Sequence, residues 1–297
     1  MNPTAQTEAN PAVKCRRKSA ATAFGRADAL WPNGEKVKEM LRSGRLEELL
    51  EMGKAARFPL MMVFLDTKCR ERRSVPEALG IVGDVEAKTL LIEALSDDDK
   101  WVRWKSVEAL GKIAEKNPGH NWSGAGAALE NALMDKEEQW MRGHAAEALG
   151  KIGYLPAVDA LIRAAREEPP KKKLKGSALR HCSVEAIRRI VEKNPSHGWS
   201  REIKAFEEFL GDADADVKWN AASAVRTAVE ASPGKEWDAL IPALLSNMAE
   251  RSVYLRMDCA EILRLLTNAR PELMTREILA AIDPEAQNAC GDEELED

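Results

Sequence analysis

Residues 102–113, Val-Arg-Trp-Lys-Ser-Val-Glu-Ala-Leu-Gly-Lys-Ile, decide the fold because the chain repeats their pattern five more times. The related segments are ERRSVPEALGIV at 71–82, MRGHAAEALGKI at 141–152, LRHCSVEAIRRI at 179–190, VKWNAASAVRTA at 217–228 and LRMDCAEILRLL at 255–266. A period of this kind predicts a stacked solenoid, in which each unit buries its apolar face against its neighbours.

The spacing of the copies is nearly constant. Their central positions are Ala78, Ala109, Ala148, Ala186, Ala224 and Ile262, which lie 31, 39, 38, 38 and 38 residues apart. Within the second copy, Val102, Ser106, Ala109, Leu110 and Ile113 fall on one face of an α-helix. Each repeat has room for a second helix, so we expect about six helix pairs.

The residues that end the first helix and begin the second helix also recur. Proline in Asn117-Pro118, Asn194-Pro195 and Ser232-Pro233 stops each first helix at the same offset. The pairs Trp122-Ser123, Trp199-Ser200 and Trp237-Asp238 follow in register. We predict that the Ser or Asp caps the second helix and that the Trp packs back onto its first turn.

Composition and charge indicate a soluble helical protein. Charged residues make up 31% of the chain and hydrophobic residues 44%. The five cysteines are far apart and never form a CxxC pair, which favours reduced thiols and a cytoplasmic location. No signal peptide or membrane-spanning run is apparent in the sequence.

Charge and apolar runs divide the chain into four parts. Residues 1–34 carry a net charge of +3 and are expected to form a disordered basic arm, and residues 35–65 an N-terminal helical cap. The apolar run 58–65 suits the core of that cap, although an exposed run would make a Met-rich partner site. The repeat solenoid occupies 66–282, and residues 283–297, with net charge −7, are expected to be a disordered acidic tail.

The motif Ala-Leu-Gly-x-Ile/Val-Gly-Asp-x-x-Ala, followed by a helix and Asp-Asp-x-x-Val-Arg, resembles the HEAT repeat. Residues 72–165 are most similar to the HEAT-like repeats named after the phycobilin lyases. The resemblance implies an all-α fold, an α–α superhelix with first helices outside and second helices lining a concave surface. Its members include scaffolds, chromophore lyases, a di-iron hydroxylase and DNA glycosylases, so fold analogy does not select a function.

Two rows of charged residues follow the repeat. A basic residue stands six positions before each centre, and a Glu stands one position before five of the six. The rows are Arg72, Arg103, Arg142, Arg180, Lys218 and Arg256, and Glu77, Glu108, Glu147, Glu185 and Glu261. We interpret them as a structural ladder, in which Arg reaches acids of the inter-repeat turns and carbonyl groups at helix ends. A ligand-binding Arg stripe is the alternative.

The residues do not support an enzyme. The di-iron hydroxylase uses His-Glu pairs, and none of the four histidines here precedes a Glu. His144 and Cys182 occupy equivalent positions but lack nearby carboxylates, which makes them a poor metal site. Trp104 and Trp219, with His181 at the same offset, suit packing better than a glycosylase groove. We therefore predict no catalytic residue, no cofactor and no metal site.

One inter-repeat turn is basic, whereas the equivalent stretches at 96–99 and 135–138 are acidic or mixed acidic. Lys171, Lys172, Lys173 and Lys175 form a basic knob near Arg180, which is a candidate contact for an acidic partner, nucleic-acid phosphates or the acidic tail. We therefore predict a non-enzymatic adaptor or assembly factor that holds a protein partner in its concave groove. A lyase- or hydroxylase-related enzyme, and nucleic-acid binding through the knob and the basic arm, are the alternatives.

Overall fold

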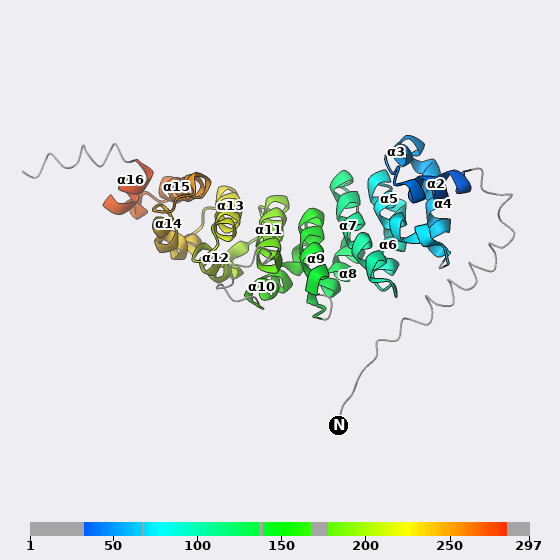
Figure 1. The fold of residues 1–297 in the computed structure, drawn as a ribbon. Helices are drawn as coiled ribbons and strands as arrows, with labels where there is room; N and C mark the ends of the chain where they lie inside the picture. The colour runs from blue at the N-terminus through cyan, green and yellow to red at the C-terminus, as the bar shows by residue number, and fades with distance from the viewer. Residues whose placement is uncertain (1–32, 67, 137–138, 168–177, 284–297) are drawn as a thin grey trace, which may run out of the picture. The chain divides into compact units, whose positions relative to one another are not determined.

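The computed structural model describes residues 33–66, 68–136, 139–167 and 178–283. Throughout these ranges the regular structure is helical, with no β-strand, so the predicted all-α fold class is confirmed (Figure 1). The chain divides into two compact units, residues 1–152 and 153–297. None of the described helices is long and apolar enough to cross a membrane.

Unit 1 begins with three helices that precede the repeats. Its helices are α2 (Gly34–Ser43), α3 (Glu48–Met52), α4 (Lys54–Leu65), α5 (Val75–Val82), α6 (Lys88–Ala94), α7 (Lys100–Lys116), α8 (Ser123–Met134) and α9 (Gln139–Ile152). The apolar run at 58–65 lies in α4, where Leu60, Val63 and Phe64 are buried. That run is therefore mostly core, although Met61 and Leu65 are half-buried and Phe58 is 57% exposed.

Unit 2 continues the alternation of a long first helix and a shorter second helix. Its helices are α10 (Val158–Glu167), α11 (Ala178–Lys193), α12 (Ile203–Leu210), α13 (Ala215–Ala231), α14 (Ile241–Asn247), α15 (Val253–Ala269) and α16 (Arg276–Ile282). The repeated segments of the sequence coincide with the first helices α5, α7, α9, α11, α13 and α15.

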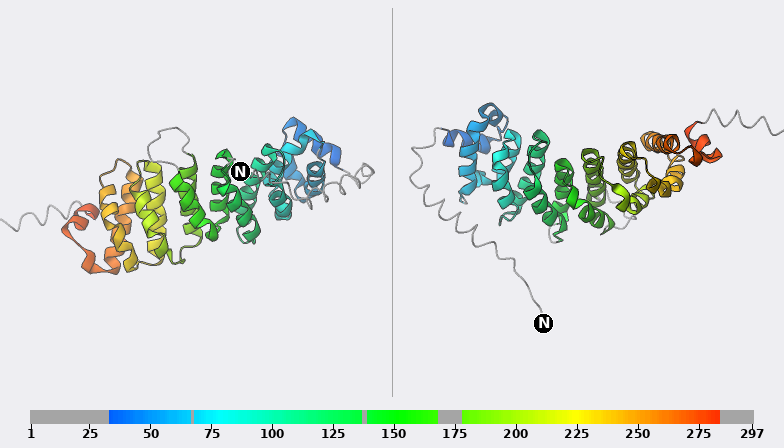
Figure 2. Two further views of the ribbon diagram at one scale, coloured as in Figure 1. Left: turned by 90° about the horizontal axis from the view of Figure 1, so that it is seen from below. Right: turned by 180° about the vertical axis from the view of Figure 1, so that it is seen from behind.

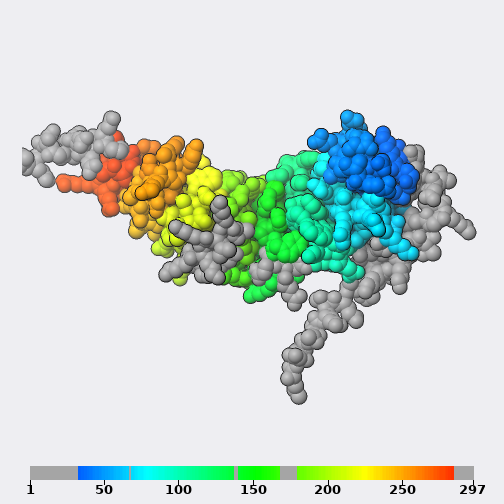
Figure 3. Space-filling view, viewed as in Figure 1, coloured from blue at the N-terminus to red at the C-terminus, as the bar shows by residue number. Residues whose placement is uncertain are grey.

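First helices pack on first helices and second helices on second helices within each unit. Helix α7 contacts both α5 and α9, α13 contacts both α11 and α15, and α6 contacts α8 while α12 contacts α14. Figure 2 shows these layers from two further sides, and in the space-filling view of Figure 3 successive repeats of a unit form adjoining bands. Small apolar residues at the repeat centres, such as Ala78, Ala109 and Ala224, are buried between neighbouring helices.

The three recurring tryptophans are buried and bond back to the end of the first helix. The indole Nε1 of Trp122 donates to the Asn117 carbonyl oxygen at 3.1 Å, and that of Trp237 donates to the Ser232 carbonyl oxygen at 2.9 Å. Trp199 donates equivalently to Asn194 at 3.2 Å. All three rings are buried, so each Trp satisfies a carbonyl in the turn that follows the first helix while filling the core.

The predicted Ser and Asp caps are wrong. At α8 the N-cap is Trp122, and Asn121 Oδ1 accepts instead from the Ser123 backbone N–H at 3.0 Å. In two other copies a 3-10 turn comes before the second helix, at Trp199–Arg201 and Lys235–Leu240. Ser200 and Asp238 lie inside those turns, because the chain makes an extra turn before the α-helical bonds begin.

Candidate binding surfaces

The recurring basic residues connect each first helix to the turns around it. Arg103 Nη1 donates to the Asp97 carbonyl oxygen at 2.6 Å, and Arg142 Nε donates to the Leu133 carbonyl oxygen at 2.6 Å. Arg256 Nη1 reaches the Glu250 carbonyl oxygen at 2.7 Å in the same way. In each case the side chain satisfies a carbonyl in the last turn of the preceding second helix or in the turn that follows it.

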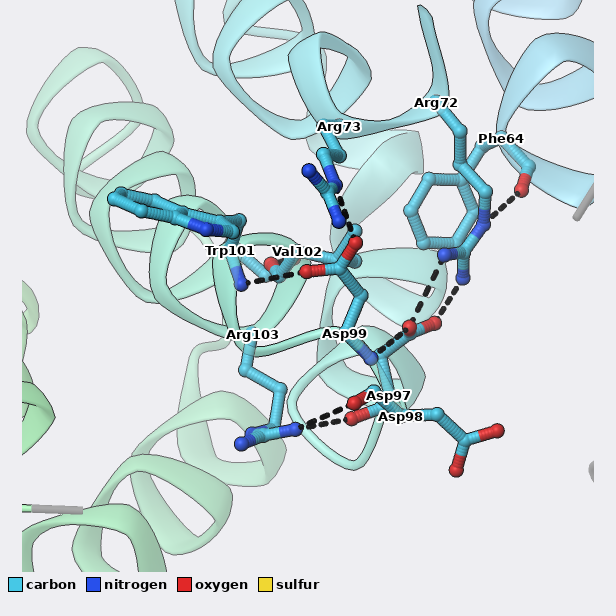
Figure 4. Close-up of polar contacts among 10 residues, drawn as sticks. Phe64, Arg72, Arg73, Asp97, Asp98, Asp99, Trp101, Val102 and Arg103 are labelled. Carbon is cyan, nitrogen blue, oxygen red and sulfur yellow. Dashed lines mark hydrogen bonds and ion pairs between the residues drawn. The ribbon is translucent and has the colours of Figure 1, made fainter. Parts of the chain in front are cut away.

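Arg72 makes this contact and a second one. Its Nε donates to the Phe64 carbonyl oxygen at 2.9 Å, while its guanidinium pairs with the Asp97 carboxylate, and both residues are buried (Figure 4). Arg180 pairs likewise with Asp212. These pairs join the start of one first helix to the acidic turn at the end of its own repeat.

The remaining member of the basic row makes the same forward contact. Lys218 Nζ lies 2.6 Å from Glu250 Oε1, the acid in the turn that follows its repeat. We propose that these contacts set the spacing of the repeats, because a buried Arg or Lys that joins two turns restricts how they move relative to one another.

The Glu row makes shorter-range contacts along the first helices. Glu147 pairs with Lys151 at 2.7 Å, Glu185 with Arg189 at 2.9 Å, and Glu261 with Arg264 at 3.6 Å. Glu77 and Glu108 both approach Lys105, at 3.5 Å and 3.2 Å. These are exposed or half-buried pairs, each of which contributes only about 0.2–1 kcal/mol to stability.

The basic knob lies outside the described residues, as do the N-terminal arm through residue 32 and the tail from residue 284. Arg180 is described, and it is half-buried and paired with Asp212. This ion pair with Asp212 therefore places Arg180 in the basic row between repeats.

Two cysteines, Cys69 and Cys259, lie in surroundings that keep their thiols protonated. Burial raises the pKa of the Cys259 thiol to about 12, and burial together with Glu71 raises that of Cys69 to about 11. The Cys69 thiol donates to Glu71 Oε2 at 3.0 Å, and this bond is the main reason that the pKa of Glu71 falls to about 2. Over the described ranges, no three His, Cys, Asp or Glu side chains gather as metal ligands.

An aromatic cleft opens on the first-helix layer of unit 1. Lys100, Trp101 and Trp104 of α7 and Trp140 and His144 of α9 line a space of about 290 Å³. The Trp104 ring lies at the centre, with ring centroids 5.4 Å from Trp101, 6.0 Å from Trp140 and 5.5 Å from His144. Trp101 and Trp140 are 46% and 43% exposed, so two large rings stand at the surface.

The polar groups of the aromatic cleft are mainly donors. Trp104 Nε1 is buried and finds no hydrogen-bond acceptor among the residues that the structure describes. Lys105 Nζ lies 4.3 Å from the centroid of the Trp104 ring, and Lys100 Nζ lies 5.9 Å from that of Trp101. Lys105 is neutralised by its two Glu partners, whereas Lys100 is exposed and forms no ion pair within the described part of the chain.

Trp104 lies among the rings of Trp101, Trp140 and His144, and reasoning from the sequence did not single out Trp101 and Trp140. A signal for them exists in the sequence, because both stand eight positions before a repeat centre. Equivalent positions on stacked first helices lie side by side, which is why the two rings meet around Trp104.

A groove of about 610 Å³ lies on the second-helix layer of unit 2. Ile241, Pro242 and Leu245 of α14 form its apolar side, and Glu272 and Glu277 stand on the side of α16 and the turn before it. This groove, which we call the α14/α16 groove, combines apolar contact area with two carboxylates.

Comparison with known proteins agrees with this fold. The model of the PBS lyase HEAT-like repeat matches residues 141–167, which hold α9 and α10. A designed armadillo repeat protein is 16% identical with a TM-score of 0.54, and covers 70% of this chain and 98% of its own. An engineered protein is 16% identical with a TM-score of 0.50, covering 98% and 83%. No curated protein matches the sequence.

Proposed function

We propose that this chain, a HEAT-type repeat protein by its fold and by its matched repeat, is a non-enzymatic scaffold that holds a protein partner against its second-helix layer. The observation that carries the proposal is the α14/α16 groove, which offers open apolar side chains on the layer that the resemblance assigns to the concave surface. A repeat scaffold binds by shape complementarity over several units and needs no catalytic group.

The chemistry of the α14/α16 groove specifies a class of partner. Ile241 and Leu245 provide apolar contact area, while Glu272 and Glu277 supply negative charge at the edge. A segment with aliphatic anchors and flanking Lys or Arg fits both features. The basic knob at 171–175, if it steers a partner at all, would act on an acidic one and so would serve a different contact. We place this activity in the cytoplasm, in line with the widely separated cysteines.

The test is affinity purification of the tagged full chain from its native host, with and without nuclease, followed by mass spectrometry. Leu245→Arg introduces charge into the α14/α16 groove, and Val253→Arg introduces the same charge at a 54% exposed position on first helix α15. A stoichiometric protein that survives nuclease, is lost with Leu245→Arg and is kept with Val253→Arg supports the proposal. If the unchanged chain and both variants capture the partner equally, the α14/α16 groove is not the binding site.

The same experiment separates the alternatives. Protein partners that vanish after nuclease would move the function to nucleic acid, and charge reversal of Lys171, Lys172, Lys173 and Lys175 would then test the knob. The absorption spectrum of the purified protein tests for a bound chromophore or a di-iron centre, because such groups absorb visible light and the protein alone does not. A coloured, stoichiometrically loaded sample would overturn the scaffold proposal.

A further inference from the structure

The first-helix layer carries an apolar surface that the proposed scaffold groove does not use. Five of the six exposed large apolar side chains of the described repeats lie on first helices, at Trp101, Trp140, Val253, Tyr254 and Met257, and the sixth, Met274, lies before α16. Solvent-exposed tryptophans are costly unless a partner covers them, and Trp is the residue most enriched in binding hot spots. The aromatic cleft gathers two of these rings around a third, which distinguishes it from scattered exposure.

From this geometry we infer that the aromatic cleft is a second interaction site, and that its partner is an acidic peptide segment with one aliphatic or aromatic anchor. The space of about 290 Å³ between Trp101, Trp104 and Trp140 accommodates a single large side chain and its adjoining backbone. An anchor seated there would bury apolar area against three rings at once.

Charge selects the acidic class. Lys100 stands at the edge of the aromatic cleft without an ion-pair partner within the described ranges, and Trp104 Nε1 has no acceptor. His144 forms no hydrogen bond with the described residues. A carboxylate or a peptide carbonyl is the group that satisfies such donors, and the buried indole N–H is destabilising while it stays unpaired in the free protein.

The same charges argue against a cationic ligand. An aromatic cage binds a quaternary ammonium or methylated lysine through open ring faces. Here Lys105 Nζ already lies 4.3 Å from the centroid of the Trp104 ring, and Lys100 lies beside Trp101. A cationic ligand would therefore find the Trp104 ring face already occupied by Lys105 and would meet the exposed charge of Lys100, which attracts an acidic peptide.

The test is selection of a random dodecapeptide library on the purified full chain, followed by titration of the enriched synthetic peptides. We expect enriched peptides with one Leu, Ile, Phe or Trp flanked by Asp or Glu. We also expect their binding to quench tryptophan fluorescence and to weaken at least 10-fold in Trp140→Ala, about 3-fold in Lys100→Gln and little in Lys100→Arg. Tyr254→Ala, which removes a 73% exposed ring from α15, is the matched control and should bind normally.

Several results would overturn the inference. The first is that the enriched peptides share a basic or purely polar consensus. The second is that they bind Trp140→Ala as tightly as the unchanged chain, and the third is that Tyr254→Ala loses as much affinity as Trp140→Ala. Concentration-dependent dimers in sedimentation that Trp140→Ala abolishes would show that a second copy of the chain covers the cleft instead. Because the α14/α16 groove lies in the other unit and the other layer, Leu245→Arg should leave peptide binding unchanged, so the two proposals fail independently.

Discussion

Gly80 lies directly against Ala109: a Cβ atom on Gly80 would come within 3.0 Å of the Ala109 Cα atom. Gly80 stands two positions after one repeat centre, and Ala109 is the centre of the next repeat. Gly111 has the same relation to Ala148, at 3.3 Å. The Ala-Leu-Gly motif of unit 1 therefore lets the backbones of neighbouring first helices approach closely, since neither position carries a bulky side chain.

This contact predicts opposite effects for two glycine substitutions. Gly80→Ala should lower the free energy of unfolding by about 1–2 kcal/mol, because overpacking against backbone exceeds the gain in helix propensity. Gly124→Ala in α8 should leave stability unchanged or raise it by up to about 1 kcal/mol, since the nearest atom, Ile92 Cδ1, is 4.0 Å away. Urea unfolding of both variants checks this, and an equal gain in both would contradict the close stacking.

In unit 2, Arg226 stands at the repeat position that Gly80 occupies in unit 1. Its contact with the next first helix is an ion pair. Arg226 Nε lies 2.9 Å from Asp258 Oδ1 of the next first helix, and burial raises the pKa of Asp258 even beside this Arg. Arg226→Met should therefore lower the free energy of unfolding by about 1–3 kcal/mol, because it leaves a partly buried carboxylate without its partner. Arg226→Met with Asp258→Asn should recover most of the loss, and calorimetry of a double-mutant cycle measures it. Additive losses would show that the pair is not coupled.

Glu202, at the start of α12, predicts that removal of its charge stabilises the protein by an amount that depends on pH. The residue is 8% exposed, its Oε2 has no hydrogen-bond partner, and burial raises its pKa. The folded state therefore binds this proton more tightly than the unfolded state, so ionisation removes stability as the pH rises from the unfolded pKa of 4.5 through the higher folded pKa.

Glu202→Gln should consequently stabilise the protein by about 1 kcal/mol at neutral pH and have little effect near pH 4. Urea titrations from pH 4 to pH 8 measure the difference between the two proteins. Glu207→Gln, on the exposed side of the same helix, should give no such trend. A constant difference for Glu202→Gln across this range would rule out the ionisation as its cause.

The hydrogen bond of Trp237, in the turn after a first helix, predicts a loss of stability when the indole donor is removed. Trp237→Phe keeps a ring in the core but removes the Nε1 donor to the Ser232 carbonyl oxygen, and should cost about 1–3 kcal/mol. Trp101→Phe, which changes a 46% exposed ring, should cost less than about 0.5 kcal/mol. Thermal unfolding distinguishes them, and a similar small loss in both would mean that the carbonyl finds water instead.

The repeat architecture follows from the sequence alone, because its period and helix faces are local and recur six times. The buried centres Ala78, Ala109 and Ala224 and the Trp of the turns were all readable from their register. Each repeat buries the same face on its neighbour, so a pattern within one copy specifies the contact between copies.

Tertiary structure decided which recurring residues meet. Arg103 and Arg72 share one position in the repeat, yet Arg72 pairs with the Asp97 carboxylate whereas Arg103 donates to the Asp97 carbonyl oxygen (Figure 4). Likewise, the Trp101 and Trp140 rings join Trp104 in one cleft only because α7 and α9 pack side by side. Sequence determines which face a residue occupies, whereas distances across two helices, and hence a binding surface, depend on how the repeats stack.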